Sequence, residues 1–357
     1  MKTVLYFSNI EVPYRNKFFN QLSKFVDLTI LYEKRSAKSR NLDWCSSIER
    51  RYKVKYIDTN HWPKSLIKII NIFKTIILKK YDYIIIGCYN TPWQMFTILL
   101  LRFFKKSYII NLDGEQFFSK SFSFKNVLKS YFLKGANRYL IAGIHSAENL
   151  KSRSFIDPSR VISYNFSSLT NEEIKTNSSK IRINKNNKVV LVVGRYYPYK
   201  GLDVAVKVAR KDKSIQYVFV GMGDRSKNFE NDFCLYNDQN IKVIPFLQQS
   251  DLEQLYLSAD AFLLPSRKEC WGLVINEAAS YGLPIVSTDG SGAAIDFISD
   301  AYSKYIAQNS NAEDIYNKLC DVFNANSDYS DYLIKRSAEY SIESMVETHI
   351  HLFMNGI

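Results

Sequence analysis

The chain has 357 residues, of which 46% are hydrophobic and 15% aromatic, so it is long enough for two domains of about 150 residues each and apolar enough to fill two cores. Its five cysteines are scattered without C-x-x-C spacing, which disfavours a zinc site or a disulfide framework and favours a reducing compartment. The first residues lack the apolar run of a signal peptide, and no stretch of about 18 uncharged apolar residues occurs, so we expect neither secretion nor a membrane-spanning helix.

The positive charge is concentrated in the first half of the chain. Residues 1–170 hold 28 of the 48 lysines and arginines but 11 of the 35 acidic residues, so this part carries a net charge of +17 and the remainder −4. A basic surface favours anionic partners, either nucleic acid or an acidic membrane. Because no module that reads nucleic acid is recognisable, we expect an anionic membrane surface and no nucleic acid.

Short apolar runs typical of strands alternate with helical patterns through the first half of the chain. The runs are residues 2–7, 26–32, 52–58, 82–88, 107–112, 138–143 and 160–165. This alternation predicts an N-terminal parallel-sheet domain over residues 1–168.

Two segments of this half combine apolar side chains with lysine. Within residues 62–80, one helical stripe consists of Leu66, Ile69, Ile70, Phe73, Ile76 and Ile77. We expect this stripe to face the core and the lysines around it to form a solvated rim. Residues 117–124 carry four phenylalanines in a serine-rich loop that has no periodic core face, so we interpret them as an interfacial patch.

A polar stretch rich in Asn, Lys and Ser, residues 169–187, is interpreted as a linker. A second series of strand-like runs follows at residues 188–194, 215–221, 241–247, 261–266 and 283–288. These runs predict a C-terminal parallel-sheet domain over residues 188–335, followed by an amphipathic C-terminal helix over residues 336–357. Ligands of such domains bind beyond the carboxyl ends of the strands.

Residues 261–288 hold the strongest signal for a ligand site. From Trp271 to Pro284 the only charged side chain is that of Glu277, and a carboxylate among apolar neighbours is costly unless it is hydrogen-bonded. Glu269 lies eight positions earlier, at the mouth of a loop. A helix that begins near Gly272 would point free N–H groups at a neighbouring anion. Taken alone, Glu277 is as compatible with a structural role as with ligand binding. Arg195 and Lys200, elsewhere in the chain, are likewise as compatible with a solvated surface role as with ligand binding.

Four ordered segments resemble the retaining GT-B glycosyltransferases of family 4. Glu269 and Glu277 have E-x7-E spacing in ECWGLVINE, with LPS before and YGLPIVST after. Residues 189–210 are similar to a segment of the family in which a strand is followed by the motifs G-R and K-G-L and then by a helix. Two further matching segments, residues 217–224 and 243–266, come next in the same order as in the family. The resemblance is strong over the second half and loose over the first. It implies an α/β fold of two Rossmann-like doubly wound domains facing across a cleft, with the C-terminal helix crossing back to the first domain.

The resemblance also implies roles for residues of the second half. Arg195 and Lys200 would hold the diphosphate of the donor, and Glu277 would accept hydrogen bonds from its ribose. Glu269 would meet the sugar hydroxyls and stabilise the oxocarbenium-like state as the diphosphate leaves. The other expected donor-binding residues are Gly272, Leu273 and Val274, through backbone amides at the diphosphate, and Gly221, Phe246 and Leu247, at the base.

The first half departs from the family's pattern in two places. Residues 8–19 replace a glycine-rich loop, so that Tyr14 and Arg15 either form the acceptor side or belong to a helix with Pro13 in its first turn. Asp113 stands where many relatives carry a histidine near the reacting sugar, and it either contacts donor or acceptor or caps the next helix. Phe117 and Phe118 are expected to bind the acceptor.

Together these observations predict a retaining glycosyltransferase on the cytoplasmic face of a membrane. The expected donor is a nucleotide sugar, with UDP as the nucleotide, and the expected acceptor is a lipid-linked glycan in capsule or O-antigen assembly. No cofactor or metal is expected, because the chain has no D-x-D pair and no histidine cluster with metal-ligand spacing. The alternatives are a GT-B sugar-nucleotide epimerase or phosphorylase, and a non-catalytic protein that binds nucleic acid or membranes.

Overall fold

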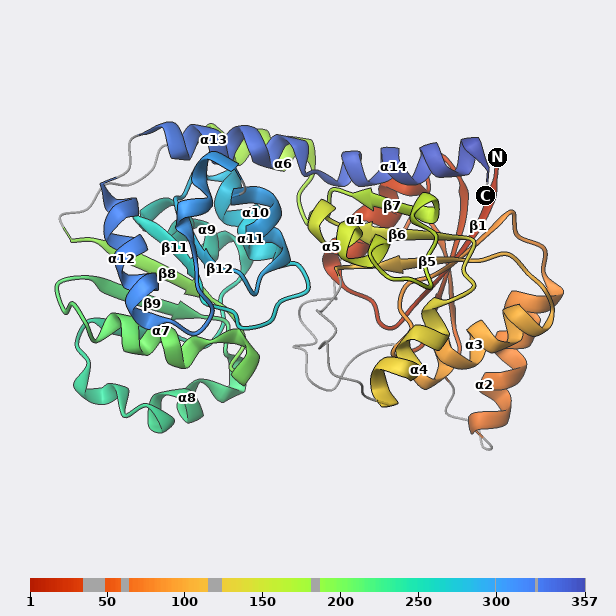
Figure 1. The fold of residues 1–357 in the computed structure, drawn as a ribbon, viewed down its shortest axis with the longest axis horizontal. Coiled ribbons are helices and arrows are strands. Elements are labelled where there is room, and N and C mark those ends of the chain that lie inside the picture. The colour runs from red at the N-terminus through yellow and green to blue at the C-terminus, as the bar shows by residue number, and fades with distance from the viewer. Residues whose placement is uncertain are drawn as a thin grey trace. The chain divides into compact units, whose positions relative to one another are not determined.

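The chain folds into two compact units, each built on one parallel sheet (Figure 1). The computed structural model describes residues 1–34, 49–58, 64–114, 124–180, 187–298, 300–324 and 327–356. Unit 1 comprises Met1–Ser168 and Ile342–Ile357, and unit 2 comprises Leu169–Ser341. Both units are α/β domains of the doubly wound type, which confirms the predicted fold class.

The sheet of unit 1 has the strand order β3-β2-β1-β4-β5-β6-β7, with every pair parallel. The strands are β1 (Thr3–Ser8), β2 (Asp27–Tyr32), β3 (Lys53–Tyr56), β4 (Tyr83–Ile86), β5 (Ile109–Leu112), β6 (Arg138–Ala142) and β7 (Val161–Tyr164). The helices are α1 (Pro13–Leu22), α2 (Lys64–Ile72) with its π-helical continuation η2 (Phe73–Leu78), α3 (Pro92–Phe103), α4 (Phe124–Leu133), α5 (Ile144–Lys151), the short 3-10 helix η3 (Pro158–Arg160) and α14 (Ile342–Asn355).

The sheet of unit 2 has the order β10-β9-β8-β11-β12-β13, again with every pair parallel. The strands are β8 (Val189–Val193), β9 (Gln216–Val220), β10 (Ile241–Ile244), β11 (Ala261–Leu264), β12 (Ile285–Thr288) and β13 (Ile306–Ala307). The α-helices are α6 (Asn171–Ser178), α7 (Leu202–Ala209), α8 (Ser226–Asp232), α9 (Gln249–Ser258), α10 (Leu273–Ser280), α11 (Gly292–Ile298), α12 (Ala312–Phe323) and α13 (Ser327–Glu339). Short 3-10 helices are η4 (Pro198–Lys200), η5 (Gly223–Arg225), η6 (Leu235–Asn237) and η7 (Asp300–Tyr305).

The central strands are buried on both faces, which explains why they were readable as continuous apolar runs. All four residues of β4 are buried, and so are all four residues of β11. A parallel sheet covered by helices on both sides selects apolar side chains at every position, so the alternation of a half-exposed strand is absent.

The stretch interpreted as a linker contains helix α6 and belongs to unit 2. Thr170 and Glu173 form a capping box at its start, with Thr170 Oγ1 accepting from the Glu173 amide and the Glu173 side chain accepting from the Thr170 amide. Asn177 donates to Ser280 Oγ of α10 at 2.9 Å, which attaches α6 to the body of unit 2. The polar composition of residues 171–178 therefore reflects a largely exposed helix of unit 2.

The C-terminal segment is two helices, and the part that belongs to unit 1 begins at Ile342. Arg336 donates to the Asp296 carbonyl at 2.8 Å, and Tyr340 packs on Phe297 with ring centroids 4.3 Å apart, which keeps α13 on unit 2. On α14, the buried His349 packs on Phe18 of α1, and Tyr83 donates to the Phe353 carbonyl at 2.7 Å. Burial lowers the pKa of His349 to about 4, so this histidine is neutral in the core.

The apolar stripe predicted for residues 62–80 does not face the core as a whole. Ile76 and Ile77 are buried, but Leu66, Ile69 and Ile70 are 53%, 37% and 40% exposed. The reason is the change from α-helix to π-helix at Phe73, since a wider turn rotates later residues away from the face that earlier ones share. The expectation of a single core-facing stripe is therefore wrong.

Candidate functional site

The strand order of unit 2 points to one edge of its sheet as the place for a ligand. Strands β8 and β11 are neighbours, and the connection leaving β8 leads to β9 on one side, whereas the connection leaving β11 leads to β12 on the other. Open α/β sheets bind ligands outside the carboxyl ends of the strands at such a switch point. The segments that leave β8 and β11 carry Arg195, Lys200 and Glu269.

Close packing holds the loop after β8 against the loop after β11. Gly201 has φ +68°, and a Cβ at this position would lie 1.9 Å from the Pro265 carbonyl oxygen, so glycine is required there. Arg267 makes a bidentate ion pair with Asp203 at 2.7 and 2.6 Å, and its amide donates to the Tyr199 carbonyl at 2.8 Å. These contacts fix the position of Lys200, which lies beside Gly201.

Lys200 and Glu269, which are 69 positions apart in the sequence, form an ion pair at this edge. The side chains are 15% and 17% exposed, so both charges are largely withdrawn from water but still accessible. The Glu269 amide donates to the Gly290 carbonyl at 2.8 Å, which anchors the backbone that carries the carboxylate. The structure therefore brings together two of the residues predicted to act on the donor.

Helix α10 begins directly beside this ion pair. Its N-cap is Gly272, with φ +106°, and a Cβ there would come within 3.4 Å of Glu269 Cγ. No side chain among the described residues caps the helix, and its first turn, which includes the half-buried Leu273 and Val274, holds no acidic residue. The first N–H groups of a helix have no intrahelical partner and attract anions, so this end is suited to phosphate.

Glu277 lies within α10 and is held by a buried tyrosine. Its Oε2 accepts a hydrogen bond from Tyr256 Oη at 2.9 Å, and the Tyr256 ring stacks on Tyr281 with centroids 5.4 Å apart. Burial, reinforced by the negative charge of Glu277, raises the pKa of Tyr256 well above its ordinary value, so the phenol stays protonated and donates. No sequence signal singled out Tyr256, because one tyrosine in an amphipathic helix is an ordinary core residue.

Arg195 is exposed and lies over the ring of Tyr197, with Cζ 5.2 Å from the ring centroid. Arg225, which sequence reasoning did not select, lies over the same ring at 4.6 Å. Two guanidinium groups therefore gather at the carboxyl ends of β8 and β9. Tyr197 serves as their common platform through cation–π contacts.

The residues predicted for the base pocket lie along the same edge of the sheet. Gly221 follows β9 with φ +98°, and a Cβ there would be 3.6 Å from the Gly194 carbonyl oxygen, so the loops after β8 and β9 adjoin. Phe246 and Leu247 follow β10, which is two strands away from β8; Phe246 is 38% exposed. No described contact joins Phe246 to the Lys200–Glu269 ion pair.

In unit 1, Asp113 and Arg15 are partners of each other. Helix α1 begins at Pro13, and the side chain of Arg15, 5% exposed, forms an ion pair with Asp113, which is 33% exposed. Arg15 also donates to Tyr6 Oη at 3.0 Å. Asp113 is thus held in an ion pair, and Arg15 lies largely buried between Asp113 and Tyr6. The roles expected of both residues at the reacting sugar or the acceptor stay predictions. Tyr14 packs edge-on against Phe166, and Phe117 and Phe118 lie outside the described residues.

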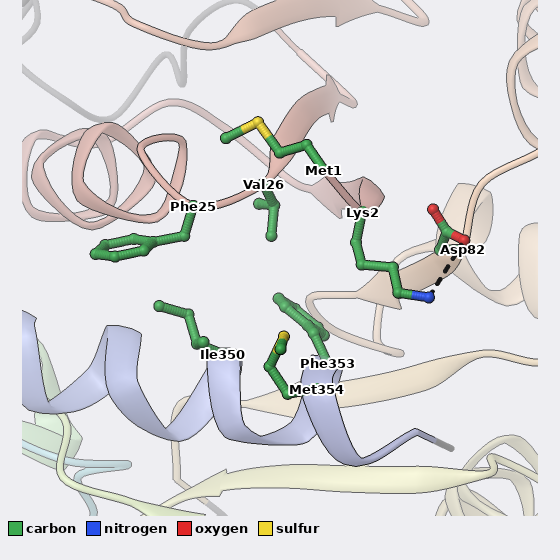
Figure 2. Close-up of a pocket in the computed structure, with 8 residues that line it drawn as sticks. All are labelled: Met1, Lys2, Phe25, Val26, Asp82, Ile350, Phe353 and Met354. Atoms are coloured by element: carbon green, nitrogen blue, oxygen red, sulfur yellow. Dashed lines mark ion pairs between the residues drawn. The ribbon is translucent and has the colours of Figure 1, made fainter.

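A cavity of about 470 Å³ opens at the opposite edge of the unit 1 sheet (Figure 2). Its walls are Phe25 and Val26 on one side and Ile350, Phe353 and Met354 of α14 on the other, with Lys2 and Asp82 paired at 3.9 Å. Lys2 and Asp82 directly precede β1 and β4, so the cavity lies at the amino ends of the strands. Ligands of open α/β sheets bind at the other edge, and this cavity is not the candidate site.

Comparison with known proteins gives a family match within unit 2. Residues 173–340 match the family model described as glycosyl transferases group 1. An uncharacterized glycosyltransferase of Haemophilus influenzae is 30% identical over 169 residues, which cover 45% of this chain and 47% of that protein. The chain thus matches about half the length of this relative.

Solved structures resemble the whole chain. HepE from Anabaena, in complex with UDP-glucose, has a TM-score of 0.73 at 14% identity, covering 99% of this chain and 100% of that one. WaaG, described as a glycosyltransferase involved in lipopolysaccharide biosynthesis, has a TM-score of 0.69 at 13% identity, covering 99% and 100%. The chain therefore has the fold of these GT-B structures, and the match to the group 1 glycosyltransferase model lies within its second unit.

Proposed function

We propose that the protein is a retaining glycosyltransferase that moves a sugar from a nucleotide sugar, with UDP as the nucleotide, to an acceptor hydroxyl. The observation that carries this proposal is the Lys200–Glu269 ion pair, held at the switch point of unit 2 beside the uncapped start of α10. A cation, a carboxylate and free N–H groups in one place suit a ligand that carries both a diphosphate and sugar hydroxyls.

The diphosphate is the leaving group, so its growing negative charge needs a counterpart in the transition state. Lys200, Arg195 and the amides at Gly272, Leu273 and Val274 supply positive charge and N–H donors for it. No group of three or more metal-ligating side chains occurs in the described part of the chain. We propose that Lys200, Arg195 and these amides do the work of a metal ion and that the reaction proceeds without one.

The two glutamates have separate roles in this proposal. The diphosphate competes with Glu269 for Lys200, which frees the Glu269 carboxylate to meet the sugar hydroxyls and the positive charge that develops on the sugar. Glu277, oriented by Tyr256, accepts hydrogen bonds from the ribose. The acceptor hydroxyl attacks from the side of the leaving phosphate and gives its proton to it, so no protein nucleophile is required.

The proposed acceptor is a lipid-linked glycan in the assembly of a surface polysaccharide, reached on the inner face of the membrane. The similarity to WaaG and the net charge of +17 over residues 1–170 support this part of the proposal. In the described residues, no helix is both long and apolar enough to cross a bilayer.

A panel of nucleotide sugars tests donor binding through thermal unfolding. We expect one UDP-sugar, present at about 100 times its Kd, to stabilise unit 2 by about 2.7 kcal/mol, which raises its melting temperature by roughly 5 °C or more. The shift should persist in EDTA, and UMP, which lacks the second phosphate, should give a smaller one. If no nucleotide sugar stabilises the protein, or if the shift requires added Mg²⁺ or Mn²⁺, the proposed donor site is wrong.

A further inference from the structure

Unit 1 exposes an unusual number of large apolar side chains on helices α2, α3 and α4. We call the following residues the α2–α3–α4 surface: Leu66, Ile69, Ile70, Leu78, Leu99, Phe103, Phe104, Val127, Leu128 and Tyr131. Phe103 is 79% exposed and Leu78 is 65% exposed. Isolated exposed apolar residues are normal, but a set of this size on neighbouring elements marks an interaction site.

Direct contacts join these elements into one surface. Lys106, just after α3, donates to the Ile77 carbonyl of η2 at 2.6 Å, and Phe104 packs on Phe73 with ring centroids 5.7 Å apart. Arg102 of α3 donates to the Tyr131 carbonyl of α4 at 2.8 Å. Figure 1 shows α2, α3 and α4 at the same end of unit 1.

The charges on these elements all have one sign. Residues 64–80, 92–106 and 124–134 contain eleven lysines and arginines and no aspartate or glutamate. Lys74, Lys79, Lys80 and Lys105 are exposed at the edges of the apolar residues. The partner must therefore be both apolar and negatively charged.

These properties distinguish between the possible partners. A second copy of the chain that used the same surface in a symmetric dimer would bring two basic surfaces together, which like-charge repulsion opposes. Nucleic acid satisfies the lysines but gives Leu78 and Phe103 no apolar environment. A bilayer with anionic headgroups satisfies both, because apolar side chains enter the boundary of the acyl chains while lysines meet the phosphates.

We propose that the α2–α3–α4 surface docks unit 1 on an anionic lipid bilayer, with Leu66, Leu78 and Phe103 inserting and the surrounding lysines contacting headgroups. This surface differs from the phenylalanine-rich loop expected from the sequence, most of which lies outside the described residues. The docking itself is independent of catalysis. Its purpose, to bring the site to a lipid-linked acceptor, rests on the proposed function.

Sedimentation with vesicles of phosphatidylcholine and phosphatidylglycerol in equal parts tests the docking. The wild type should bind these vesicles at low salt, bind pure phosphatidylcholine much more weakly, and dissociate as salt rises. The triple variant Leu66→Ser, Leu78→Ser, Phe103→Ser should bind at least about tenfold more weakly, since it removes the inserting side chains. The matched control, Ile144→Ser with Tyr236→Ser, changes residues that are 54% and 81% exposed elsewhere and should bind like the wild type.

Three results would overturn the proposal: no binding of the wild type to anionic vesicles, equal binding of the triple variant, or loss of a homodimer in the triple variant without loss of vesicle binding. Thermal unfolding in the absence of lipid should be the same for the wild type, the triple variant and the control, because every changed residue is exposed.

Turnover of a nucleotide sugar in solution is measured in parallel. The triple variant should retain it, so a failure of the proposed donor chemistry would appear in every protein and would be distinguishable from a failure of docking.

Discussion

Lys200→Ala is expected to lower kcat/KM for the nucleotide sugar by about 30- to 1000-fold, equivalent to about 2–4 kcal/mol of transition-state stabilisation. The variant removes the cation that meets the leaving diphosphate and leaves Glu269 without its partner. Arg195→Ala should lose a similar amount, because its exposed guanidinium lies at the carboxyl end of β8, over the ring of Tyr197. Steady-state kinetics in EDTA measure both effects.

The chain offers a matched control for this experiment in the Lys211–Glu313 ion pair, which lies elsewhere in unit 2. Lys211→Ala should leave the kinetics unchanged. Undiminished turnover by Lys200→Ala and Arg195→Ala, or an absolute requirement for Mg²⁺ or Mn²⁺, would show that these residues do not hold the diphosphate.

The two glutamates should separate in their kinetic effects. Glu269→Gln is expected to reduce kcat, by about 100-fold, because its charge acts on the developing oxocarbenium ion and so mainly in the transition state. Glu277→Gln should mainly raise KM, because a ribose contact stabilises the bound substrate and the transition state equally. Tyr256→Phe should shift KM in the same direction, since it removes the hydrogen bond that orients Glu277.

Glu313→Gln is the corresponding control, because Glu313 forms an exposed ion pair with Lys211. The opposite pattern, with kcat reduced by Glu277→Gln and KM raised by Glu269→Gln, would mean that the roles are exchanged. Wild-type kinetics for both variants would mean that the E-x7-E spacing is structural in this protein.

The fold was predictable because its signals are local. Strands such as β4 and β11 are buried on both faces and read as continuous apolar runs, and the alternation of strands and helices specifies parallel sheets. The contact between Lys200 and Glu269 was not predictable from spacing, because the two residues are 69 positions apart and are brought together by the packing of Gly201 against Pro265. Only the resemblance to a known family had placed both residues at one ligand.

Features that the sequence analysis did not anticipate have several physical causes. A π-helical turn at Phe73 divides a stripe that is continuous in the sequence. The polar composition of residues 169–187 did not suggest helix α6, although the residues of its capping box, Thr170 and Glu173, are present in the sequence. Asp113 forms an ion pair with Arg15, which is 98 positions away in the sequence. Arg225 and Arg195 both make cation–π contacts with the ring of Tyr197. None of these contacts leaves a periodic trace in the sequence.

Transfer of the sugar itself tests the central claim most directly. The purified chain is incubated in EDTA with the stabilising nucleotide sugar and a lipid-linked glycan, and the anomeric proton of the transferred sugar is followed by NMR. We expect release of the nucleoside diphosphate and a new glycosidic bond with the anomeric configuration of the donor, and we expect both to be lost in Lys200→Ala. Absence of transfer, inversion at the anomeric carbon, or an epimerised nucleotide sugar in place of a glycoside would contradict it.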